Sequence, residues 1–137
     1  MIQFVDVKSD QNPRIAIQSG GLIFCNHSLV LRQAGNDFWT IEDDNVGDKN
    51  PNDLDGRPQT DQHPITEALK DHKGTVVLRW SLDIAALQSS GELYDVSISI
   101  IMDNDFKILG HYKHTDEGFD LLTSIRHETG FTILTVG

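Results

Sequence analysis

The sequence predicts an all-β protein, an antiparallel two-sheet sandwich of about eight strands with one short helix. The first observation behind this prediction is that apolar and polar side chains alternate along several segments, which is typical of strands with one buried face. The second is that these segments are short, are separated by turn-forming residues, and have few helical patterns between them. A small β-barrel is the alternative, because it uses the same pattern. A chain of 137 residues fits one domain, residues 1–137.

The clearest strands lie in the second half of the chain. Residues 75–84 place five apolar side chains on one face, namely Val76, Leu78, Trp80, Leu82 and Ile84. Residues 94–102 repeat the alternation, and the Asp-Asn-Asp sequence after them is turn-forming. A third strand follows, with Phe106, Ile108 and Tyr112 predicted on its apolar face. These last two strands are predicted to form a hairpin.

Shorter strands are predicted nearer the N-terminus, at residues 2–7, 14–18, 21–26, 28–33 and 37–42. Turn-forming pairs separate them, including the Asn-His pair at positions 26 and 27. Residues 131–136 form the last predicted strand. A short helix is predicted over residues 64–74, because Pro64 suits a first helical position and Gly74 suits a helix end. Residues 119–130 fit either a helix or a strand, and the strand is favoured.

The net charge and the cysteine content limit the kinds of binding partner and the compartment that we expect for this protein. A net charge of −10 argues against nucleic acid and anionic membranes, which attract Lys and Arg patches. The single cysteine, Cys25, lies among apolar residues and cannot form an intrachain disulfide. No secretory signal or bilayer-spanning apolar run is present in the sequence, so we expect a cytoplasmic protein. A secreted mature form would have the same composition.

Residues 42–64 are the most distinctive stretch. Seven acidic and two basic residues give this stretch half of the net charge of the chain, and it holds three of the four prolines. Asp, Asn, Gly and Pro favour turns, and proline cannot donate to a central strand. The stretch is therefore predicted to be a long acidic surface loop. Connections of this length in compact domains are usually either functional or disordered.

This predicted loop does not match an EF-hand calcium site. With Asp48 at the first position, Asp53 takes the place of the glycine and Gln59 the place of the bidentate glutamate. With Gly56 at the glycine position, Pro51 comes first and Gln62 comes last. No cofactor is therefore predicted, and a calcium site of another kind is kept only as an alternative.

Neither a catalytic residue nor a metal ligand is predicted. The chain has no Gly-x-Ser-x-Gly elbow, no Walker A loop and no basic neighbour that would activate Cys25. The six histidines are scattered, and only His111 and His114 have a spacing that resembles metal ligands. On one strand these two would point to opposite faces, so the histidines are expected to face solvent.

The predicted function is that of a non-enzymatic binding module, which engages a small ligand or a protein through loops at one end of the sandwich. Trp39 adjoins the acidic loop, and aromatic side chains beside polar loops are common in binding sites. The predicted ligand-binding residues are Trp39, Asp48, Asp53 and Asp55. Two alternatives stay open: a structural protein that self-associates as a homodimer, and a calcium-dependent binding domain.

Overall fold

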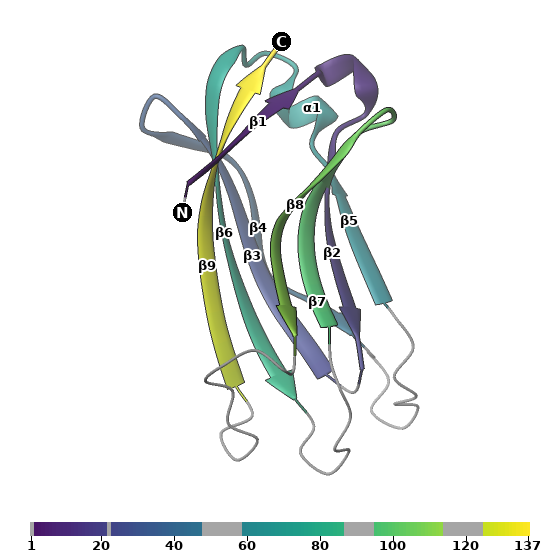
Figure 1. The fold of residues 1–137 in the computed structure, drawn as a ribbon. Coiled ribbons are helices and arrows are strands. Elements are labelled where there is room, and N and C mark those ends of the chain that lie inside the picture. The colour runs from purple at the N-terminus through teal and green to yellow at the C-terminus, as the bar shows by residue number, and fades with distance from the viewer. Residues whose placement is uncertain (1, 22, 48–58, 87–94, 114–124) are drawn as a thin grey trace.

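Two β-sheets packed face to face make up the fold in a computed structural model (Figure 1). The structure describes residues 2–21, 23–47, 59–86, 95–113 and 125–137. The first sheet has the order β1-β9-β6-β3-β4, formed by Gln3–Val7, Ile125–Val136, Gly74–Ala86, Ile23–Gln33 and Asn36–Gly47. The second sheet has the order β5-β2-β7-β8, formed by Gln59–Pro64, Arg14–Gly20, Asp95–Ile101 and Phe106–Lys113.

The predicted two-sheet sandwich is confirmed, and the described strands do not close into a barrel. Neighbouring strands pair antiparallel, except that β1 runs parallel to β9. A 3-10 turn, Ser9–Gln11, and one short helix, α1 (Thr66–Leu69), complete the described elements. In the described parts of the chain, no helix has the length and apolar character of a membrane-spanning segment.

The core lies between the two sheets and is built by the predicted alternation. Every second residue of β6 from Val76 to Ile84 is buried, and the same holds for β7 from Val96 to Ile100. Trp80 is only 4% exposed, which confirms its predicted place in the core. Since each buried aliphatic side chain contributes roughly 1.5–3 kcal/mol, this apolar layer supplies most of the drive for the sheets to pack.

One difference from the predicted strands concerns β3. The predicted break between residues 21–26 and 28–33 is absent, because Ile23–Gln33 is one continuous strand. Inward-facing residues alternate through the predicted turn without interruption: Ile23, Cys25, His27, Leu29 and Leu31 are all buried. A strand interior satisfies the backbone groups of Asn26 and His27 in the ladder, so the local turn preference of this pair is overridden.

The predicted loop over residues 42–64 differs from the structure at both ends. Residues 42–47 continue β4, and residues 59–64 form β5. Pro64 ends β5, an edge strand, where a missing N–H is tolerated. Asp48, Asp53 and Asp55 lie in residues 48–58, outside the described residues.

The predicted hairpin of β7 and β8 is confirmed, but the predicted apolar face of β8 is wrong for Phe106 and Ile108, whereas Tyr112 packs against the core as predicted. A bulge shifts the register between Ile98 and Ser99, so that Leu109 is buried while Phe106 and Ile108 are exposed. A short helix is confirmed inside the predicted range 64–74, but it spans only Thr66–Leu69, since Pro64 ends β5 and Gly74 begins β6. The favoured strand in residues 119–130 is confirmed from Ile125 onward, and residues 119–124 lie outside the described residues.

Candidate functional site

Four ionisable side chains converge at the side of the sandwich where β4 lies against β5. We call His27, Asp44, Asp61 and His63 the quartet; one nitrogen or oxygen from each lies within 4.8 Å of all the others. The Nε2 atoms of His27 and His63 are 2.9 Å apart. Oδ2 of Asp44 lies 3.5 Å from the former and 3.4 Å from the latter. The quartet is therefore a compact set of two imidazoles and two carboxyl groups.

A β-bulge brings Asp44 to His27. His27 pairs with Asp44 and Leu29 pairs with Ile41, so two residues of β3 span three residues of β4. The extra residue is accommodated at Asp43, whose φ of 50° is left-handed, a conformation that aspartate tolerates better than most residues. Without the bulge, Asp43 would lie opposite His27, and the carboxyl group of Asp44 would face outward.

The other half of the quartet comes from β5 in the opposite sheet. Asp61 and His63 are two residues apart, so their side chains lie on the same face of the strand. Their partners in β2 are Ile17 and Ile15, both fully buried, which fixes that face toward the interior. β4 and β5 contact each other across the gap between the sheets. The packing of the sheets therefore completes the quartet.

Burial shapes the electrostatics of the quartet. The side chain of His27 has no exposed surface, and this desolvation, helped by the adjacent His63, lowers the pKa of its imidazole. Partial burial acts to raise the pKa of Asp44, but a hydrogen bond with Asp61 and the nearby imidazole of His27 outweigh it and lower the pKa. Oδ2 of Asp61 is buried and has no hydrogen-bond partner among the described residues. Neutral imidazoles beside carboxylates are the ionisation states that metal ligands require.

The spacing of the quartet suits a small metal ion. Zinc lies about 2.0–2.2 Å from nitrogen and oxygen ligands, so its tetrahedral ligand atoms are about 3.3–3.6 Å apart. Two of the separations, 3.4 and 3.5 Å, already fall in that range. The Nε2 atoms of His27 and His63, at 2.9 Å, would move apart by roughly half an ångström.

Of the predicted ligand-binding residues, the structure describes only Trp39, and Trp39 does not lie at the quartet. Trp39 is half-buried on β4, opposite Leu31, and packs against the core together with Phe38. It lies five residues along the strand from Asp44, on the order of 15 Å away. The predicted contributions of Asp48, Asp53 and Asp55 fall outside the described residues.

The expectation that the histidines face solvent is wrong for the quartet. His27 is buried, and the side chain of His63 is only 14% exposed. His111 fits the expectation better, because its side chain is 39% exposed and hydrogen-bonds Asp95. Residue 114 lies outside the described residues. Two features of the sequence point to the quartet: a histidine in an otherwise apolar alternation, and the Asp-x-His spacing of β5.

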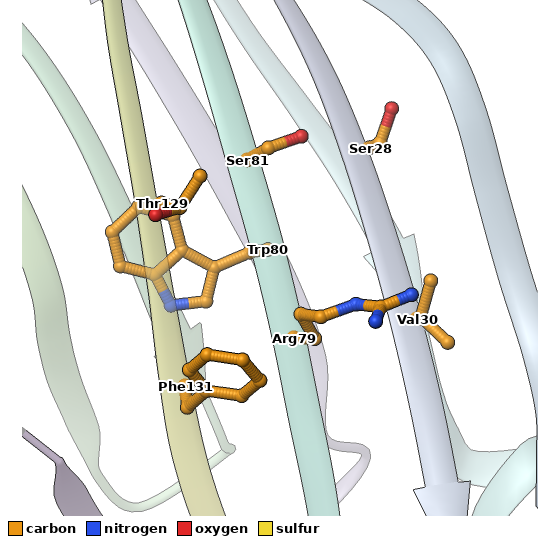
Figure 2. Close-up of a pocket in the computed structure, with 7 residues that line it drawn as sticks. All are labelled: Ser28, Val30, Arg79, Trp80, Ser81, Thr129 and Phe131. Carbon is orange, nitrogen blue, oxygen red and sulfur yellow. The ribbon is translucent and has the colours of Figure 1, made fainter.

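A second feature is a hollow of about 320 Å³ on the outer face of the five-stranded sheet (Figure 2). Ser28, Ser81 and Thr129 face each other in register across three strands and form a row of small hydroxyl side chains. Arg79 and the half-exposed Phe131 flank this row, and the buried ring of Trp80 lies beside it. The described lining has no buried charged group, so the quartet is the stronger candidate site.

Comparison with protein-family models, with curated proteins and with solved structures gave no match to this chain. The functional argument therefore depends on the geometry and chemistry of the quartet alone.

Proposed function

We propose that the protein is a non-enzymatic binding module that holds a divalent transition-metal ion at the quartet. The observation that carries this proposal is the convergence of two imidazole nitrogens and two carboxyl groups to within 4.8 Å of one another. These are standard ligands of zinc and related ions. Four polar groups this close together at the edge of an apolar core are costly unless something compensates for their burial, and a cation does so.

The donor set favours a transition-metal ion over calcium. Calcium takes six to eight oxygen ligands, whereas two of the four donors here are imidazole nitrogens. Zinc, cobalt and nickel bind imidazole readily. Two ionised carboxylates beside two neutral imidazoles also balance the charge of a divalent ion.

Zinc titration of tag-free protein at pH 7.5 tests the proposal by calorimetry and thermal unfolding. We expect one ion per chain. Zinc at a hundredfold above its Kd adds about 2.7 kcal/mol, which for 137 residues raises Tm by roughly 9 °C. A chelator should reverse the shift, and calcium at the same concentration should give none.

Two variants separate the quartet from adventitious binding. His63→Gln removes one nitrogen donor at a side chain that is 14% exposed, and we expect the zinc-dependent rise in Tm to disappear. His111→Gln is the matched control, because His111 lies on another strand and pairs with Asp95. It should keep the full response. Equal zinc responses in the two variants, or no response in the unmodified protein, would contradict the proposal.

A further inference from the structure

The four ligands of the quartet come from both sheets. His27 and Asp44 belong to β3 and β4 of the five-stranded sheet, while Asp61 and His63 belong to β5 of the four-stranded sheet. β4 and β5 are edge strands, and among the described residues neither forms ladder hydrogen bonds with the other. An ion at this position would therefore bond directly to both layers of the sandwich.

We infer that the bound ion is a four-coordinate structural clamp, with every ligand supplied by the protein, that joins the two sheets along their β4–β5 edge. This inference rests on the proposed function, because it requires that the quartet binds a metal. Beyond metal binding, it states that the ion has four protein ligands and that its role is structural. Structural zinc sites use four protein ligands, whereas catalytic sites use three and keep a position for water.

The position of the ligands supports a closed site. The side chain of His27 has no solvent exposure, so the ion would be covered from the β3 side. His27 lies between Cys25 and Leu29 in the buried alternation of β3. On β5, Asp61 and His63 face inward opposite fully buried isoleucines of β2. The quartet thus lies at the margin of the core, where His27 and the inward face of β5 cover the position and Asp44, with 37% of its side chain exposed, forms its solvent side.

The clamp also explains the buried oxygen of Asp61. Oδ2 of this residue has no hydrogen-bond partner among the described residues, and an isolated buried carboxylate oxygen is strongly disfavoured. A cation at the quartet supplies the missing interaction. Without the cation, the two sheets meet here through the 2.9 Å contact between His27 and His63 and the 3.4 Å contact between His63 and Asp44.

Cobalt(II) in place of zinc tests the coordination class in the full chain. A four-coordinate cobalt ion gives intense visible absorption bands, and a six-coordinate ion gives weak ones. We expect the intense bands, unchanged by added azide, because no coordination position is open. Weak bands, or bands that shift with azide, would overturn the closed four-coordinate site.

Hydrogen exchange measured with and without zinc tests the clamp itself. We expect zinc to slow exchange at least tenfold in both β4 and β5, since local opening of either strand must break a metal bond. Asp61→Asn and Asp44→Asn, one change in each sheet, should each remove this protection from both strands. Protection of one strand alone would overturn the clamp, and so would a zinc-dependent protection that persists in either variant.

The outcomes separate the clamp from the proposed function. If neither zinc nor cobalt binds the unmodified protein, both are wrong. If the metals bind but give a six-coordinate spectrum, or protect only one sheet, metal binding stands and the clamp is wrong. Should a variant fail to fold, its partner variant from the other sheet gives the same test, and His111→Gln serves as the folded control.

Discussion

Replacing Gly130 with alanine tests how Trp80 fills the core. Gly130 of β9 pairs with Trp80 of β6, and a Cβ atom at position 130 would lie within 3 Å of several indole atoms, too close for any Cβ contact. On its other side, the ring lies 3.0 Å from the Cβ position of Gly110 in the opposite sheet. The two glycines thus leave the space that the indole occupies beside the hollow in Figure 2.

The expected loss of stability follows from this contact. Forcing an extra carbon into a packed core costs about 1–3 kcal/mol when neighbours can shift. Expelling the ring altogether would expose up to about 200 Å² of apolar surface, worth roughly 5 kcal/mol, which sets the upper limit. Because the ring is confined between Gly130 and Gly110 and cannot shift freely, we expect the Gly130→Ala variant to lose about 3–5 kcal/mol.

Urea unfolding followed by circular dichroism measures this change, with Gly20→Ala as the matched control. A Cβ atom at Gly20 meets only the Asp95 carbonyl oxygen at 3.9 Å, so this variant should be neutral or gain up to about 1 kcal/mol. In a Trp39→Phe background, emission reports Trp80 alone and should shift only in Gly130→Ala. If that variant unfolds at the same urea concentration as the control, with unchanged emission, the close packing of the indole is refuted.

Two further predictions concern buried ionisable groups. Burial, with a smaller contribution from Asp83, raises the pKa of Cys25 to about 12, so iodoacetamide at pH 8 should leave the thiol unmodified in the folded protein and alkylate it in urea. The second prediction concerns chelator-treated protein, in which folding lowers the pKa of His27 from its ordinary value of 6.5. Because the unfolded chain then binds this proton more readily than the folded one, the free energy of unfolding should fall as pH drops below about 6.5. Urea midpoints at pH 7.5 and 5.5 measure this fall. His27→Leu should flatten the dependence in that window, and an equal slope in the variant would show that another group is responsible.

Local patterns were sufficient to predict most of the fold. A strand with one buried face must alternate buried apolar side chains with outward-facing ones. The central residues of β6 and β7 follow this alternation without exception. The errors arise where a neighbouring strand decides the outcome. The extra residue Leu109 turns Phe106 and Ile108 outward in the first half of β8, and pairing with β4 and β6 on both sides keeps β3 continuous through His27.

The candidate site was harder to predict, because its residues meet only after the sheets pack. His27 could have been noticed as a polar residue in an apolar series, and Asp61 with His63 as a same-face pair. Their meeting depends on the approach of two edge strands, and the contribution of Asp44 depends on the extra residue at Asp43. Neither feature has a local signature in the sequence. The prediction centred on Trp39 followed composition instead, and composition does not encode contacts between sheets.

The parallel pairing of β1 with β9 has a consequence for the order of assembly. These are the first and last described strands, and Val7 pairs with Val136. Contacts so distant in sequence carry the largest loop-closure cost in the sheet. During synthesis β1 is made before β9, the strand with which it pairs among the described residues. This edge of β9 is therefore covered by β1 only after strands β2 to β8 have been synthesised between them.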